Sequence, residues 1–301
     1  MNKVLYFFVI IIIFSFVFYY KEDILVYYNN YISTNKQVPT TLSKNEYYRD
    51  LNFKYVQNTE NFSPNDKKDI LNIYYTVINS GMDEFTFYCN TDYENCINDV
   101  KDIANNQITI SNINNFVHPY NGFKDLETEI DSLGKITLKI NRNYTEEMKI
   151  ILNYKIDDII KNNIDDNMDL EEKIKVIHDY IINNTKYDSD RSDKNIIKYK
   201  SDTAYGALIE GYALCGGYTD SMMLFLEKLN IKNYKISSEN HIWNYVYLEN
   251  DGWYNLDLTW DDPVSKTGKD LLEHTFFLVT DEELLKLDAT EHTYNKDVYQ
   301  N

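Results

Sequence analysis

Hydrophobic positions change their spacing along the chain, and each spacing predicts a different element. Residues 4–20 are apolar throughout and contain no charged residue, Gly or Pro. A helix of that length spans about 26 Å, near the lower limit for crossing a bilayer. No small-x-small cleavage site follows, which favours an uncleaved anchor at 1–21 over a cleaved signal peptide. A buried core helix is the weakest alternative, because the segment is apolar on every side.

The charges beside the apolar segment predict its orientation. Lys3 and the α-amine favour a cytoplasmic N-terminus, whereas Lys21 is followed by two acidic residues. We therefore expect a single-pass protein whose remaining chain lies outside the cytoplasm.

A mixed region separates the predicted anchor from the C-terminal half. Residues 22–60 are polar with weak periodicity and predict a stalk or linker. Residues 61–165 alternate between helical and strand spacing and predict a mixed α/β accessory domain. Its expected elements are helices at 63–78, 92–104 and 145–162 and strands at 85–89 and 135–142.

The pattern is clearest in residues 166–301. Asp169 and Glu172 form a capping-box signature, and apolar residues at helical spacing continue to about Asn184. His178 lies beside that apolar face, so we expect a packing histidine. A short helix is expected at 203–209, then a helix ending at about Leu229. Alternating residues at 241–248 and 253–260 then predict two antiparallel strands. These features predict an α+β fold with a helix packed on an antiparallel sheet.

Charge and motifs exclude several classes of function. The chain has 30 basic and 48 acidic residues, a net charge of −18, which repels phosphate backbones and argues against nucleic-acid binding. It contains no Cys-x-x-Cys, His-Glu-x-x-His or glycine-rich phosphate loop, so we predict neither a metal site nor a cofactor. Calcium dependence is left open, because no ordered acidic loop marks a site.

One cysteine has the sequence context of a nucleophile. Cys215 lies in Gly-Tyr-Ala-Leu-Cys-Gly-Gly-Tyr (211–218), at the predicted start of a helix. Free backbone N–H groups and the positive end of a helix favour the nucleophilic thiolate there. Gly216 and Gly217 would leave room for a substrate backbone. The alternative is a small buried cysteine.

A histidine and a carboxylate follow on the two predicted strands. His241 begins the first strand, and Asp257 lies in the second, an order typical of a thiol protease triad. A two-residue turn at Asp251-Gly252 would pair residues whose numbers sum to 503, which places His241 opposite Asp262. His241 faces Asp257 only if the sum is 498, so a bulge or wider loop is needed or Asp261 or Asp262 is the partner.

Together these motifs resemble the transglutaminase-like superfamily, over about residues 169–290. The spacings are more similar to bacterial and cytokinesis-type members than to animal transglutaminases. The resemblance implies a papain/transglutaminase-like core with Cys215 as nucleophile, His241 as general base and acid, and Asp257 as orienting carboxylate. The matching segments are EKIKVIHDYIINNTKYD (172–188), GYALCGGY (211–218), HIWNYVYL (241–248), GWYNLDLTWDDP (252–263) and FFLVTDEELL (276–285).

Several residues near these motifs keep two interpretations. The Cys215 amide can supply one oxyanion donor, and Tyr187 is a candidate for the second or a packed aromatic. Trp243 and Trp260 are cleft walls or core residues. Outside the cytoplasm, Cys89 and Cys96 could form a disulfide that leaves Cys215 free; otherwise they are two buried thiols.

The chemistry implied is acyl transfer from an amide through a Cys215 thioester. Hydrolysis is slightly favoured over transamidation, because no feature for a second substrate is visible. We expect a protein or peptide substrate, such as a cell-wall or surface protein of a low-GC bacterium. The alternative is a surface binding module that kept the fold and lost activity.

Overall fold

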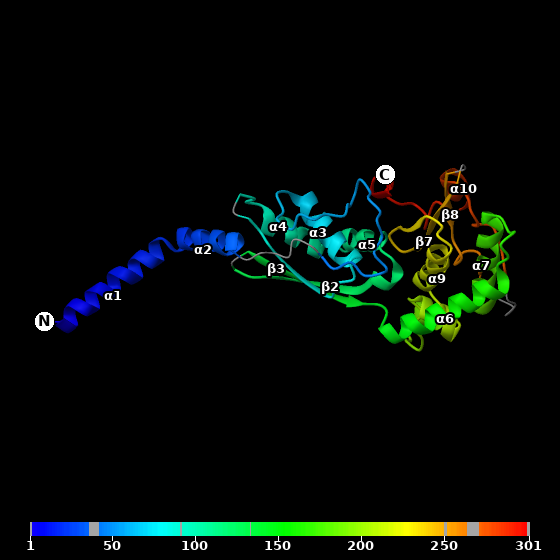
Figure 1. Ribbon diagram of the computed structural model, residues 1–301, viewed down its shortest axis with the longest axis horizontal. Coiled ribbons are helices and arrows are strands. Elements are labelled where there is room, and N and C mark those ends of the chain that lie inside the picture. Colours follow the sequence, from blue (N-terminus) through cyan, green and yellow to red (C-terminus); the bar gives the residue numbers. More distant parts are fainter. Residues whose placement is uncertain are drawn as a thin grey trace.

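The computed structural model describes residues 2–35, 42–90, 92–132, 134–249, 252–263 and 271–299. Two N-terminal helices, α1 (Asn2–Tyr19) and α2 (Lys21–Asn35), extend away from the folded body (Figure 1). Among the described residues, no helix combines the length and the apolar character needed to cross a membrane. The anchor predicted at 1–21 is therefore not supported.

Residues 42–60, the described end of the predicted 22–60 linker, pack on the body. Phe53 and Val56 are buried, and the Phe53 N–H donates to the Val56 carbonyl at 2.8 Å. The buried Arg49 side chain donates to the Phe116 carbonyl at 3.2 Å. These residues pack against the rest of the chain, and the division at residue 60 stays a prediction. The few apolar residues of this segment are anchors spaced too irregularly to give a periodic pattern.

A three-stranded antiparallel sheet forms the base of the N-terminal half, in the order β1-β3-β2. Helices α3 (Lys67–Asn79), α4 (Cys96–Asn105) and α5 (Gln107–Asn114) lie along one face of it (Figure 1). The predicted helices and strands are present with small shifts at their ends. Strand β2 and helix α5 were not predicted. The elements are α3 (Lys67–Asn79), β1 (Glu84–Tyr88), α4 (Cys96–Asn105), α5 (Gln107–Asn114), β2 (Phe123–Ile130), β3 (Lys135–Arg142) and α6 (Glu146–Asn163).

A disulfide joins Cys89 to Cys96, with their Cα atoms 5.7 Å apart. It ties the end of β1 to the first residue of α4. Of the two alternatives for this pair, the structure contains the bridge, and Cys215 is the free cysteine.

Removing this bridge should destabilise the fold measurably. The two cysteines are seven positions apart, and closing so short a loop lowers the entropy of the unfolded chain by an amount worth about 2–3 kcal/mol. We expect the Cys89→Ser, Cys96→Ser double variant to lose about that much unfolding free energy in urea titrations. Equal midpoints for wild type and variant under oxidising conditions would contradict a stabilising role.

The C-terminal half places helix α9 on a second antiparallel sheet, ordered β6-β7-β8. This is the predicted helix-on-sheet arrangement. The capping box predicted at the start of α7 (Leu170–Asn184) is also present, with Asp169 and Glu172 bonded reciprocally. The elements of this half are α7 (Leu170–Asn184), β4 (Lys186–Tyr187), α8 (Ser189–Lys194), β5 (Tyr212–Ala213), α9 (Cys215–Lys228), β6 (Asn233–Ser237), β7 (Ile242–Leu248), β8 (Gly252–Leu256) and α10 (Asp281–Leu287). Short turns of helix lie at Gly206–Glu210 and Lys296–Tyr299 in this half and at Pro119–Asn121 in the N-terminal half.

Two hydrophobic cores stabilise the body. The first surrounds the N-terminal sheet, but it also includes Tyr234, Ile236 and Trp243 from β6 and β7. The second joins α6, α7 and α9 to the inner residues of β7 and β8. The first core therefore extends across the boundary proposed between 61–165 and 166–301. The division into two domains stays a prediction.

Candidate active site

Cys215 is the first residue of α9, and its side chain is partly exposed. Leu214 precedes it in extended conformation and provides no side-chain cap. The N–H groups of Gly217 and Tyr218 bond the Leu214 carbonyl at 2.9 and 3.1 Å, so the helix begins directly at the thiol. The first amides of a helix lack intrahelical acceptors. The sulfur therefore sits at the positive end of α9, where negative charge is favoured.

The two glycines after Cys215 have a packing role. A Cβ on Gly217 would overlap the carbonyl oxygen of Ser201, and one on Gly216 would lie 3.1 Å from the carbonyl oxygen of Asp202. Leu214 also donates its N–H to the Ser201 carbonyl at 2.8 Å. Gly217 thus lets the first turn of α9 approach the 201–203 segment closely. The structure gives no support to the prediction that Gly217, which is buried, lines a substrate cleft; Gly216 is partly exposed.

His241 and Asp257 meet where β7 begins and β8 ends. The His241 Nε2 lies 2.5 Å from the Asp257 Oδ2, and both side chains are buried. Leu248 pairs with Gly252, so partners in the ladder have numbers that sum to 500. Neither 503 nor 498 is correct. Extending this register places Asp257 opposite Trp243, so His241 reaches Asp257 as a diagonal neighbour on the same face.

The pair forms a strongly coupled acid and base. Burial lowers the pKa of His241, but the charge of Asp257, its hydrogen bond and the neighbouring Cys215 together raise that pKa to about 10. Burial raises the pKa of Asp257, but His241 and His292 hold it well below its usual range. Because Asp257 occupies Nε2, Nδ1 is the His241 nitrogen left to act on Cys215. This arrangement favours an imidazolium beside the thiol.

A second histidine, His292, binds the same carboxylate and was missed by sequence reasoning. Its Nε2 lies 2.9 Å from the Asp257 Oδ2, and its Nδ1 lies 2.9 Å from Asp288. The other Asp257 oxygen accepts the backbone N–H of Thr259 at 2.9 Å and of Trp260 at 3.3 Å. Asp257 is thus fixed by four donors. The i, i+4 spacing of Asp288 and His292 was the available signal, but nothing in it pointed to Asp257.

The alternative carboxylates have other partners. Asp261 lies 3.1 Å from the Nε2 of His178 and accepts the Phe276 N–H at 2.8 Å. Asp262 accepts a hydrogen bond from the Tyr218 hydroxyl. Neither is the partner of His241. His178 is fully buried, as expected of a packing residue, but both its ring nitrogens face carboxylates.

The predicted cleft aromatics differ in position. Trp243 is fully buried and donates its Nε1–H to Asn255 at 2.8 Å, so it is a core residue beneath His241. Trp260 is partly exposed, and its ring centroid lies 5.1 Å from that of His292. Tyr187 pairs with Ala213, two residues before Cys215. Burial raises the pKa of Tyr187, and Cys215 contributes to the shift. Trp260 and Tyr187 therefore remain candidates for contacting a substrate.

Two groups in the described part of the chain have the donor atoms to hold a metal ion. One is His241, Asp257 and His292. All three side chains are buried, and both histidines are hydrogen-bonded to Asp257. Its donor atoms serve the acid–base arrangement described above. The second group is His178 and Asp179 on α7 with His274 on the 271–278 segment, and it runs from the buried His178 to the exposed His274.

Comparison with known proteins agrees with this geometry. Residues 158–258 match the model of the Transglutaminase-like superfamily. The matched residues include Cys215, His241 and Asp257, so the predicted resemblance to this superfamily is confirmed.

Two solved structures are similar at low identity. One is a crystal structure of a TGase, with 16% identity and a TM-score of 0.36, over 48% of this chain and 46% of that one. The other is described as a putative cysteine protease from Cytophaga hutchinsonii, with 12% identity and a TM-score of 0.28, over 49% of this chain and 65% of that one. This chain therefore covers less than two thirds of either structure. No curated protein matches it.

Proposed function

We propose that this protein is a cysteine enzyme that acts on amide bonds through a thioester with Cys215. The observation that carries the proposal is the buried His241–Asp257 pair beside a thiol at the uncapped start of α9. Cys215 is the nucleophile, His241 the general acid and base, and Asp257 the group that orients His241. These are the roles that a thiol triad requires.

The first half of the reaction forms the acyl-enzyme. The Cys215 thiolate attacks the amide carbonyl, and the oxyanion forms near the first amides of α9. Imidazolium His241 gives its Nδ1 proton to the departing amine, so the C–N bond breaks as the C–S bond forms. Asp257 stays ionised and stabilises the imidazolium at the other ring nitrogen.

The second half releases the acyl group. Neutral His241 takes a proton from the attacking group, the thioester C–S bond breaks, and the thiolate–imidazolium pair is restored. Water as the attacking group gives a peptidase or amidase, whereas a primary amine gives a cross-linker. We favour hydrolysis slightly, because Cys215 is partly exposed to solvent and no second-substrate site is evident among the described residues.

We also propose that the enzyme acts outside the cytoplasm on a protein or peptide. The Cys89–Cys96 disulfide supports this location, because such bridges persist in oxidising compartments. Cell-wall or surface proteins are the expected substrates there. The net charge of −18 supports a partner other than nucleic acid. Anchoring through residues 1–21 forms no part of the proposal.

The test is thiol labelling of the full chain with iodoacetamide across pH. A free cysteine reacts slowly below its pKa of about 8.5. We expect Cys215 to react rapidly near pH 6, Cys215→Ala to remove the labelling, and His241→Ala to remove the fast reaction. Amide donors, with and without added primary amines, then distinguish hydrolysis from transamidation.

Labelling of Cys215 that is slow below pH 8 and unaffected by His241→Ala would overturn the enzyme assignment. The second candidate, a catalytically silent binding module, would then stand. It would be pursued through binding partners.

A further inference from the structure

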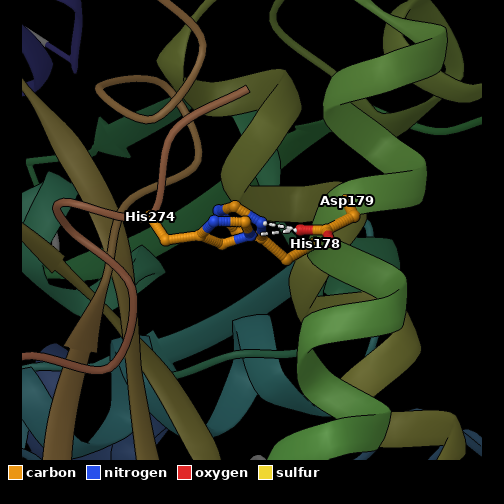
Figure 2. Close-up of side chains that lie close together, drawn as sticks. All are labelled: His178, Asp179 and His274. Carbon is orange, nitrogen blue, oxygen red and sulfur yellow. Dashed lines mark hydrogen bonds and ion pairs between the residues drawn. The ribbon is translucent and has the colours of Figure 1, made fainter. Parts of the chain in front are cut away.

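A second group of chemically active side chains lies apart from Cys215, where α7 meets the 271–278 segment. Figure 2 shows His178 and Asp179 on α7 and His274 on the facing segment, with both imidazole rings directed at one carboxylate. The Asp179 Oδ1 lies 2.9 Å from the His178 Nδ1 and 2.6 Å from the His274 Nε2. His178 is buried, Asp179 is partly exposed and His274 is exposed, so solutes can reach the group from solvent.

His178 faces a carboxylate at each ring nitrogen, and its neutral form leaves one of these contacts without a hydrogen. Its Nε2 lies 3.1 Å from the buried Asp261 Oδ2, and its Nδ1 faces the Asp179 Oδ1. A neutral imidazole has one N–H and can donate to only one of the two carboxylates. When it donates to Asp261, the lone pair on Nδ1 points at a carboxylate oxygen. A cation between Nδ1 and Oδ1 removes that repulsion, and His274 offers a further nitrogen to the same cation.

We propose that His178, Asp179 and His274 form a binding site for a divalent transition-metal ion of the zinc class. Two imidazole nitrogens and one carboxylate oxygen, all within 4.8 Å of one another, form a donor set typical of zinc sites with an open fourth position. Hard cations such as Ca²⁺ prefer oxygen ligands and are disfavoured here. Asp261 acts as the carboxylate that orients a metal-binding histidine from behind.

The existing geometry needs only a small opening to admit the ion. Bonds of about 2.0 Å in a tetrahedral site separate ligand atoms by about 3.3 Å, slightly more than the 2.9 and 2.6 Å contacts to Asp179. Lys175 now contacts His274 and lies 3.5 Å from the Asp179 Oδ2. Its ammonium therefore places positive charge beside the site and competes with a metal ion.

The site is joined to the triad by backbone contacts. The Asp261 N–H donates to the Asp257 carbonyl at 3.2 Å, and the Asp257 N–H donates to the Phe276 carbonyl at 3.1 Å. Phe276 is two residues from His274. A bound ion would fasten the 271–278 segment to α7 and hold the turn that carries Asp257. The metal proposal rests on this geometry and is independent of the proposed acyl-transfer chemistry.

The experiment titrates the metal-free full chain with Zn²⁺ by calorimetry and with Co²⁺ by visible absorption. Both use the Cys215→Ala background, because a thiol beside His241 is itself a metal ligand. We expect a single equivalent to bind, a Co²⁺ spectrum without thiolate charge transfer, and a rise in melting temperature with Zn²⁺. His274→Ala and Asp179→Asn should each weaken binding by about 10-fold or more.

Two further variants make the test specific. Lys175→Met removes the competing charge and should tighten Zn²⁺ binding, whereas a purely structural cluster would give no such gain. Asp190→Asn alters a carboxylate paired with Lys194 and Lys198 and should leave binding unchanged. The proposal is overturned if Zn²⁺ fails to bind the Cys215→Ala protein. It is also overturned if His274→Ala and Asp179→Asn bind Zn²⁺ as tightly as their parent.

Discussion

Replacing Asp257 by asparagine should lower amide turnover by about 10³–10⁴-fold, the loss expected when a triad histidine is held in the wrong tautomer. The Asp257 Oδ1 is bonded by the N–H groups of Thr259 and Trp260. An asparagine oxygen would therefore stay on that side, and its NH₂ group would face His241 and His292. A donor at that position makes the His241 Nε2 an acceptor and leaves the proton on Nδ1, where it cannot take the thiol proton.

Iodoacetamide labelling of Cys215 near pH 6 measures this effect without a known substrate. At that pH a free thiol is ionised to about 0.3%, so loss of the ion pair should slow labelling by about 10²-fold. Asp288→Asn is the graded control, because it touches His292 but leaves the Asp257–His241 contact in place. Its labelling should slow far less. Wild-type labelling of a folded Asp257→Asn protein at every pH would show that Asp257 does not orient His241.

The helix that begins at Cys215 and the contact between His241 and Asp257 could be predicted because each depends on local sequence. Cys215 precedes two glycines at the start of an amphipathic helix, and His241 and Asp257 lie at the ends of short alternating strands. Their meeting in space follows from the hairpin. The two-residue turn at Asp251-Gly252 was wrong, because the numbers of ladder partners sum to 500 and not to 503. The alternative of a wider loop, which keeps Asp257 as the partner of His241, is the one the structure contains, and an Asp-Gly pair alone does not set loop length.

The residues that sequence reasoning missed are brought in by long-range packing. His292 reaches Asp257 across 35 positions, and His274 reaches Asp179 across 95 positions. Neither pair forms a local motif with metal-ligand or capping spacing. His178 was correctly predicted as a buried residue of α7, but its partner Asp261 lies on a turn whose position depends on the whole C-terminal sheet. Such contacts require the tertiary structure.

In a Cys215→Ala background, the stability of the protein should fall as pH rises from about 6.5 toward 10, and His241 should account for much of that fall. Its pKa is about 10 in the folded state and about 6.5 when unfolded. A raised folded pKa means that the stabilising contribution is complete below 6.5 and is lost as pH approaches 10. In between, the folded state binds more protons, so the unfolding free energy decreases by about 1.4 kcal/mol per pH unit.

The measurement is urea unfolding of Cys215→Ala and of the Cys215→Ala, His241→Gln double variant at pH values from about 6.5 to 9.5. Removing the thiol takes away a group that would ionise in the unfolded state within this window and offset the histidine, and unfolded tyrosines ionise only above it. Glutamine keeps an N–H donor for Asp257 but cannot titrate, so the difference between the two proteins isolates the histidine. That difference should shrink by on the order of 4 kcal/mol across the window. Because Asp257 has its pKa held below the usual range, it loses its contribution only in acid and cannot mimic this result. A difference independent of pH would mean that His241 is neutral beside Asp257, and the thiolate–imidazolium pair would lose its basis.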